Sequence, residues 1–189
     1  MYHCESLTNE QISHIYREHM KHDFPSSELK PLAMIRKHLK AGLYRCIGLF
    51  RGDELCGYAF LVRINDSGRT YYLLDYFAVL SGMRGQGIGS EFLEILKAQL
   101  ASADIVLCES EAPEGCTGEE LETRRRRIDF YLRCGLSDTG VKAEVFGVTY
   151  VLLSFGSREL SAEAVQQAYE AIYRSFLPQR IYNRMIRLF

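Results

Sequence analysis

A glycine-rich segment constrains the fold of this chain more than any other feature of its sequence. It runs from Val79 to Ser90, between an apolar stretch at 70–80 and an amphipathic pattern at 87–100. Because glycine has no Cβ, the glycines at 85, 87 and 89 allow the backbone to turn tightly and to approach a ligand closely. The segment therefore predicts a strand, a tight turn and a helix in succession.

This predicted turn has the chemistry of an anion site. The first amides of a helix have no partner within the helix, and the helix dipole favours negative charge there. Arg84 adds a fork of donors that suits phosphate oxygens. The segment therefore indicates pyrophosphate binding. A turn whose glycines serve only packing is the alternative.

Two common nucleotide-binding motifs fit this segment poorly. A P-loop ends in Gly-Lys-Ser/Thr, whereas Gly89 is followed by Ser90 and no lysine is present. A Rossmann turn needs Gly-x-Gly-x-x-Gly after the first strand of a parallel unit. Here the spacing is Gly85-Gln-Gly-Ile-Gly89, and the preceding strands have the pattern of an antiparallel meander.

The remaining patterns predict a mixed α/β protein. Apolar and β-branched runs predict strands at 2–6, 43–50, 54–64, 70–80, 104–109, 141–146 and 148–155. Helical periodicity predicts helices from Thr8, from Pro31 to Lys40, at 87–100, at 118–133 and through a C-terminal extension at 160–189. Thr8 and Gln11 form a capping-box pattern, and Gly42 is placed to end the second helix.

Composition excludes several classes of protein. The chain has 189 residues, of which 47% are hydrophobic and 25% charged, as in a folded globular protein. Its formal net charge of -1 predicts no bulk attraction to nucleic acid or to anionic membranes. The longest uncharged apolar stretch, Tyr58–Val62, is too short to span a bilayer, and no secretory signal pattern is present.

Cysteine and histidine spacing predicts no metal site. The six cysteines include no Cys-x-x-Cys pair, which favours a reducing, cytoplasmic location. His14, His19 and His22 lie near one another, but their spacing does not place all three on one helical face. No ligand set for zinc is therefore expected.

Two motifs resemble those of the GNAT superfamily of acetyl-coenzyme A-dependent N-acetyltransferases. The signature Gln/Arg-x-x-Gly-x-Gly/Ala is matched by Arg84-Gly-Gln-Gly-Ile-Gly89, and a later helix end is matched by Phe130-Tyr-Leu-Arg-Cys-Gly-Leu136. The resemblance covers residues 1–155 and implies a mixed, mostly antiparallel central sheet with helices on both faces. It leaves a helical extension at 156–189 unexplained.

The resemblance implies how acetyl-coenzyme A, the acetyl donor, is bound. Backbone groups of Phe77, Ala78 and Val79 are expected at a bulge where the fourth strand splays from the fifth, paired with the pantetheine arm. The amide of Val79 is expected to polarise the thioester carbonyl. The pyrophosphate is expected against the amides of Arg84, Gly85, Gln86, Gly87, Ile88, Gly89 and Ser90.

The same resemblance assigns Tyr131 as the general acid that protonates the departing thiolate. The alternative is a half-buried structural tyrosine. Many family members carry Asn seven residues earlier, where this chain has Arg124. We expect Arg124 to contact a pantetheine carbonyl or a phosphate, although Arg124–Arg127 also fits a solvated helix face.

Two carboxylates are candidates for the general base that deprotonates the incoming amine. Glu109 comes first because it ends the strand beside the expected splay. Asp75 comes second because a carboxylate inside the apolar run LLDYFAV is costly unless it is paired or functional. Alternatively, Asp75 faces solvent from the polar side of its strand.

Residues 109–122 contain several acidic residues and no basic residue before Arg124. Such a segment predicts a negative mouth that favours a cationic amine, either a small molecule or a peptide. The acidic residues are Glu109, Glu111, Glu114, Glu119, Glu120 and Glu122.

Together these features predict a single acetyltransferase domain at 1–155 that transfers acetyl to a primary amine in a ternary complex. The alternatives are a non-catalytic acyl-coenzyme A-binding regulator and an interaction module that binds no cofactor. The extension at 156–189 is expected to pack on the domain, to form a homodimer contact or a lid, or to touch a membrane surface.

Overall fold

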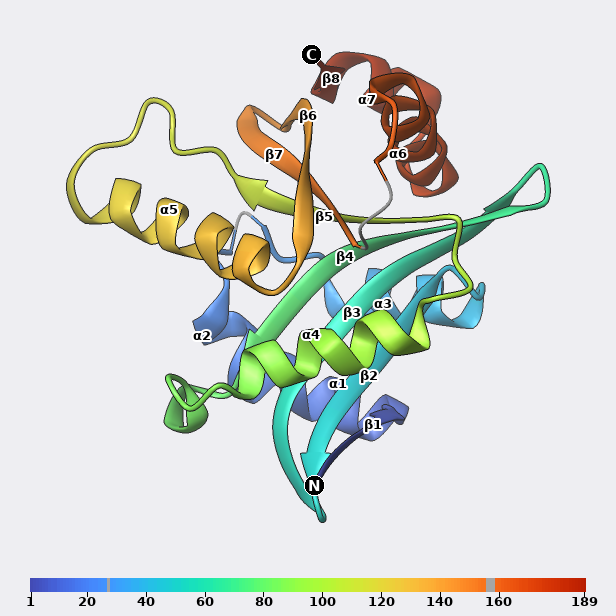
Figure 1. Ribbon diagram of the computed structural model, residues 1–189. Coiled ribbons are helices and arrows are strands. Elements are labelled where there is room, and N and C mark those ends of the chain that lie inside the picture. Colours follow the sequence, from blue (N-terminus) through green and yellow to red (C-terminus); the bar gives the residue numbers. More distant parts are fainter. Residues whose placement is uncertain (27, 156–158) are drawn as a thin grey trace. The chain divides into compact units, whose positions relative to one another are not determined.

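The computed structural model describes residues 1–26, 28–155 and 159–189 (Figure 1). The chain forms two compact units. The first comprises Met1–Arg63 and Leu74–Gln99, and the second comprises Ile64–Leu73 and Leu100–Phe189. Hydrogen bonding orders the strands as β1-β2-β3-β4-β5-β7-β6-β8. The predicted mixed fold with a mostly antiparallel sheet is thereby confirmed.

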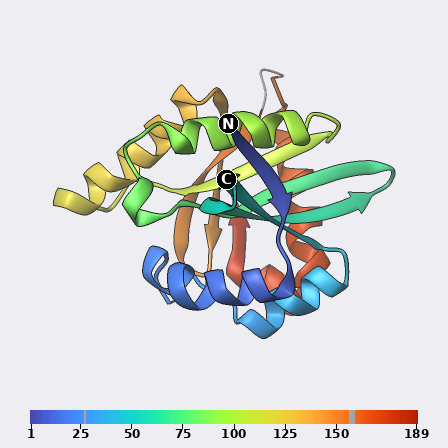
Figure 2. The same cartoon turned by 90° about the horizontal axis from the view of Figure 1, so that it is seen from below.

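The first unit contains the amino-terminal strands and helices. Its elements are β1 (Tyr2–Ser6), α1 (Asn9–Ile15), a π-helical turn (Tyr16–Met20), α2 (Lys21–Asp23), α3 (Leu32–Lys40), β2 (Tyr44–Arg51), most of β3 (Glu54–Asp66), the second half of β4 (Arg69–Val79), a 3₁₀ turn (Ser81–Met83) and α4 (Ile88–Gln99). Helices α1–α3 cover one face of its strands and α4 covers the other (Figure 2).

Local sequence explains these elements. The predicted capping box is present, because the Thr8 side chain accepts from the Gln11 amide and Gln11 accepts from the Thr8 amide. Gly42 follows α3 with φ of +72°, as a helix-ending glycine does. Strand β3 is buried without interruption from Cys56 to Val62, since helices cover both faces of the sheet.

The second unit contains the tip of the β3–β4 hairpin and the carboxy-terminal half of the chain. Its further elements are β5 (Ile105–Glu111), α5 (Gly118–Arg133), β6 (Leu136–Val145), β7 (Val148–Phe155), α6 (Ala162–Phe176), α7 (Gln179–Met185) and β8 (Ile186–Leu188). Helices α5 and α6 lie on opposite faces of the β5-β7-β6 strands (Figure 1).

Two predictions about this unit were wrong. Strand β6 begins at Leu136, ahead of the predicted start at 141, because a register shift between Asp138 and Lys142 lets it continue. The extension is not helical to its end, since Ile186–Leu188 pairs with β6. An apolar–charged–apolar triplet is too short to reveal a strand when its partner lies about forty residues away in the sequence.

The extension belongs to the second unit. Its predicted start at residue 156 lies outside the described residues, and α6 contacts β5 and β6. The contribution of the extension to a domain boundary, a dimer or a lid stays a prediction. Within the described residues, none of the helices has the length and apolar character needed to cross a bilayer.

Candidate active site

The predicted site residues fall in both units. The first unit carries Asp75, Phe77–Val79 and the glycine turn Arg84–Ser90. The second carries Glu109, Arg124 and Tyr131. The structure therefore groups the predicted cofactor loop with one candidate base, and the predicted acid with the other.

Two of the three glycines predicted to form the turn have left-handed backbones, whereas Gly89 already lies in α4. Gly85 and Gly87 have φ values of +77° and +80°, where residues with a Cβ are strained. A Cβ at either position would meet no heavy atom within 4 Å, so the turn borders open space. The Gly87 carbonyl accepts from the amides of Ser90 and Glu91 at 3.1 and 3.2 Å, which begins α4. An open, left-handed turn ahead of a helix fits a bound phosphate.

The end of β4 approaches its neighbour β3 closely. A Cβ at Gly57 would lie 2.7 Å from the Ala78 carbonyl oxygen, so only glycine fits there. The Leu80 amide donates to the Cys56 carbonyl at 2.9 Å. The Phe77 ring packs against Phe92 of α4, with centroids 5.1 Å apart. These contacts fix the backbone that leads into the glycine turn.

Arg84 is tied to two parts of the first unit. Its Nε donates to the Val79 carbonyl at 3.0 Å, and its Nη2 forms an ion pair with Asp23 of α2. The other Asp23 oxygen accepts from the Tyr58 hydroxyl at 2.7 Å. Burial, and then this contact with Asp23, raises the pKa of Tyr58 above its usual range. A phosphate contact by Arg84 stays a prediction.

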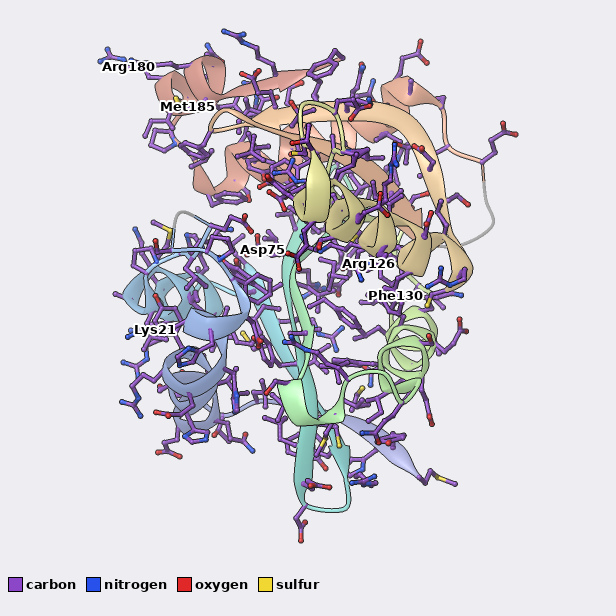
Figure 3. All side chains as sticks on the ribbon, turned by 90° about the vertical axis from the view of Figure 1, so that its left-hand side faces the viewer. Lys21, Asp75, Arg126, Phe130, Arg180 and Met185 are labelled. Atoms are coloured by element: carbon purple, nitrogen blue, oxygen red, sulfur yellow. The ribbon has the colours of Figure 1, made fainter. Side chains whose placement is uncertain are left out.

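Asp75 lies on β4 (Figure 3), and both of its carboxylate oxygens accept hydrogen bonds. The Lys30 ammonium donates to both carboxylate oxygens at 2.6 and 2.9 Å, and the Tyr44 hydroxyl donates to Oδ2. The Asp75 side chain is 7% exposed, so the alternative in which it faces solvent was wrong. Burial, and then the charge of Asp75, raises the pKa of Tyr44 well above its usual range.

Glu109 accepts from two tyrosines of α6. The hydroxyls of Tyr169 and Tyr173 both donate to its Oε1, the second at 2.7 Å. The two rings stand 4.7 Å apart, centroid to centroid. Burial, and then the charge of Glu109, raises the pKa of Tyr169 well above its usual range. Both phenols therefore act as donors to a carboxylate at neutral pH.

Tyr131 is buried on α5, with 7% of its surface exposed, which is deeper than the half-buried position that the structural alternative assumed. Its role as acid or as a structural residue stays a prediction. Its hydroxyl is hydrogen-bonded to the Cys108 thiol. Burial, and then the neighbouring thiol, raises the pKa of Tyr131 well above its usual range. Burial likewise raises the pKa of the Cys108 thiol to about 12. The phenol therefore keeps its proton at neutral pH, as a general acid must.

Arg124 bridges the segment between β5 and α5. It donates to the Ala112 carbonyl at 2.8 Å and pairs with Glu111 at 3.1 Å and Glu120 at 2.8 Å. Its side chain is 16% exposed, so the solvated-face alternative was wrong for Arg124. That alternative describes its neighbours better, since Arg125 and Arg126 are exposed. Cofactor binding by Arg124 stays a prediction.

Four of the six acidic residues expected to form a negative mouth are paired with arginine or lysine. Glu111 pairs with Arg124 and Arg127, and Glu114 pairs with Lys142. Glu120 forms an ion pair with Arg124, and Glu122 forms one with Arg125. Glu109 instead accepts hydrogen bonds from two tyrosines. The basic partners follow this acidic segment in the sequence, so composition within 109–122 could not reveal them.

Sequence reasoning missed the residues that surround the two candidate bases. Lys30 and Tyr44 carried no motif, and Tyr169 and Tyr173 were assigned only to an apolar helix face. One signal was available: two tyrosines four residues apart on a buried face need partners for their hydroxyls. Among the described residues, no three His, Cys, Asp or Glu side chains gather as metal ligands.

Comparison with known proteins agrees with this geometry. The model of the acetyltransferase (GNAT) family matches residues 9–136, which is more than half of the chain. No curated protein matches the chain significantly.

Solved structures share the fold. An acetyltransferase of this family from Bacteroides thetaiotaomicron has a TM-score of 0.72 at 20% identity, covering 92% of this chain and 98% of its own. The Escherichia coli ribosomal-protein-S18-alanine N-acetyltransferase has a TM-score of 0.60 at 16% identity, covering 85% and 99%. Arabidopsis thaliana Naa50, in complex with the bisubstrate analogue CoA-Ac-MVNAL, has a TM-score of 0.59 at 14% identity, covering 82% and 99%. The chain belongs to the acetyltransferase (GNAT) family.

Proposed function

We propose that this protein is an N-acetyltransferase that moves an acetyl group from acetyl-coenzyme A to a primary amine by direct attack in a ternary complex. The observation that carries the proposal is the open glycine turn before α4, with Gly85 and Gly87 in left-handed conformations. Family membership supports acetyl-coenzyme A as the donor. The turn would hold the pyrophosphate through backbone amides, and the end of β4 would bind the pantetheine arm.

Tyr131 is the general acid of this proposal. A departing thiolate gains charge and takes a proton from a donor that is still protonated at neutral pH. The ordinary pKa of a tyrosine, about 10, already keeps the Tyr131 phenol in that state, and burial raises its pKa further. The Tyr131 hydroxyl donates to the Cys108 thiol, and this hydrogen bond orients the phenol.

Glu109 is the general base, in preference to Asp75. An attacking amine must lose a proton, and a carboxylate that is already paired with an ammonium is a poor acceptor. Asp75 has such a partner in Lys30, whereas the donors to Glu109 in α6 are neutral phenols. Successive side chains of a strand point to opposite faces, so Glu109 and Cys108 face different helices.

The acceptor is proposed as a peptide or small-molecule amine. Structural neighbours include a ribosomal-protein alanine acetyltransferase, an enzyme bound to a peptide-based bisubstrate analogue and an aminoglycoside 6'-N-acetyltransferase. A panel of peptide amines, aminoglycosides and polyamines covers these chemistries. Coenzyme A release on any member, with acetylated product found by mass spectrometry, supports the proposal.

Two variants separate catalysis from binding. Tyr131→Phe keeps the ring, so we expect turnover to fall by about 10²–10⁴ while cofactor affinity persists. Gly87→Val strains a left-handed position and fills the space before α4. It should abolish the stabilisation by acetyl-coenzyme A, which linkage puts at about 2.7 kcal/mol at a hundredfold excess over Kd.

Other outcomes favour the alternatives. Cofactor binding without acetylation of any amine would favour a non-catalytic regulator. An unchanged melting temperature with millimolar cofactor would favour an interaction module and would contradict the proposal.

A further inference from the structure

The carboxy-terminal helix α6 contacts the proposed general base although it lies outside the matched family region, which ends at residue 136. Tyr169 and Tyr173 are four residues apart and therefore lie on the same face of α6. That face is packed, since Tyr169 is 0% and Tyr173 is 5% exposed. Each side chain thus holds its hydroxyl in a defined place.

Both hydroxyls converge on one carboxylate oxygen, Glu109 Oε1. A hydrogen bond to an ionised carboxylate is roughly twice as strong as one between neutral groups. Two donors on one oxygen also restrict rotation of the carboxylate about its terminal bond. The contact joins residues 60 and 64 positions apart, so it depends on the docking of α6 onto the strands.

We propose that α6 positions the general base of the reaction, with Tyr169 and Tyr173 as positioning residues that hold Glu109. The inference rests on the proposed function. It gives the extension a part in the reaction that is more than packing. Neither tyrosine touches the reacting atoms. Each acts through Glu109.

The structure distinguishes this role from simple packing. An apolar helix face would pack equally well with phenylalanine, which lacks the hydroxyl. Tyr182 of α7 offers a control, because its side chain is also mostly buried, at 8% exposed, but its hydroxyl is hydrogen-bonded to Arg174. Replacement by phenylalanine removes one hydroxyl at each of the three positions. At 169 and 173 that hydroxyl contacts Glu109, and at 182 it does not.

The kinetic test measures kcat and KM for these three variants and for the Tyr169→Phe/Tyr173→Phe double variant. A reacting group misplaced by about 1 Å can cost about 10²-fold in rate. We expect kcat of the double variant to fall about 10- to 100-fold with KM for acetyl-coenzyme A unchanged. Tyr182→Phe should keep wild-type kcat. Equal kcat in all variants would overturn the positioning role.

A second test needs no activity. Urea unfolding of Tyr169→Phe, Glu109→Ala and the combined variant forms a double-mutant cycle. The shift of the unfolding midpoint in the combined variant should be smaller than the sum of the single shifts. Tyr182→Phe with Glu109→Ala should be additive. If the shifts of Tyr169→Phe and Glu109→Ala simply add in the combined variant, the contact between the two residues is overturned. Tyr173→Phe replaces Tyr169→Phe in the cycle if the latter does not fold.

The two tests separate this inference from the proposed function. Wild-type protein that acetylates no amine would overturn the proposed function, and the positioning role with it. Active wild-type protein with unaffected tyrosine variants would overturn the positioning role alone.

Discussion

Asp75 and Glu109 are carboxylates inside apolar strands, one in each compact unit, and tyrosine hydroxyls contact both. They differ in their remaining partners. Asp75 is bound through both oxygens by the Lys30 ammonium, whereas Glu109 receives a second phenol from Tyr173. An ammonium binds both oxygens of the first carboxylate, while two neutral phenols of α6 donate to one oxygen of the second. Similar sequence contexts therefore produce a structural ion pair in one unit and a candidate base in the other.

The largest expected effect is a loss of turnover on substitution of Glu109 that substitution of Asp75 does not cause. Glu109→Gln removes the proposed proton acceptor, so kcat should fall by about 10²–10⁴. Asp75→Asn should reduce stability more than turnover, because the Asp75 carboxylate forms an ion pair with Lys30. Steady-state kinetics at saturating acetyl-coenzyme A, with melting temperatures for both variants, measures this. Loss of turnover in Asp75→Asn alone would reverse the two assignments.

The next effect concerns stability in the first unit. Lys30→Met leaves the Asp75 carboxylate, which is 7% exposed, without its cation. Removing one partner of a buried pair costs about 3–5 kcal/mol, and the low end applies because Lys30 is 22% exposed. Urea unfolding measures the loss.

Lys97→Met is the matched control for that change. Lys97 pairs with Glu94 at the surface, where an ion pair contributes about 0–1 kcal/mol. Equal losses at Lys30 and Lys97 would show that Asp75 does not depend on its cation.

The smallest effect is a shared response to alkaline pH. Burial raises the pKa of Tyr44 and of Tyr169, so the folded state keeps protons that the unfolded state releases. Stability from each tyrosine is therefore complete below about pH 10 and is lost as pH rises further. The slope is at most about 1.4 kcal/mol per pH unit for each tyrosine.

Unfolding free energies between pH 8 and pH 11, for wild type, Tyr44→Phe and Tyr169→Phe, measure these slopes. Each variant should lose part of the alkaline slope. A slope unchanged in both variants would contradict the assignment of these groups.

Much of the site's local geometry could be predicted from the sequence. The capping box at Thr8, the helix end at Gly42 and the left-handed glycines at 85 and 87 were all predictable. Each depends on residues a few positions apart, so backbone stereochemistry decides it. The two family motifs could also be recognised from the sequence, since each occupies one short segment of the chain.

The partners of the functional side chains could not be predicted in this way. Asp75 is paired across 45 residues with Lys30, and Glu109 across 60 residues with Tyr169. Composition in 109–122 predicted a negative mouth, but four of its six carboxylates pair with cations from α5 and β6. Strand β8 likewise needed β6 before it could form.

The sequence by itself determined the fold class, the glycine turn and the candidate acid, because periodicity, positive φ and short motifs are local properties. Tertiary structure alone decided which carboxylate is bound by an ammonium and which is held by phenols. The reason is physical: the cost of burying a charge is offset only by groups that folding brings within hydrogen-bonding distance. Those groups here come from parts of the chain far away in sequence.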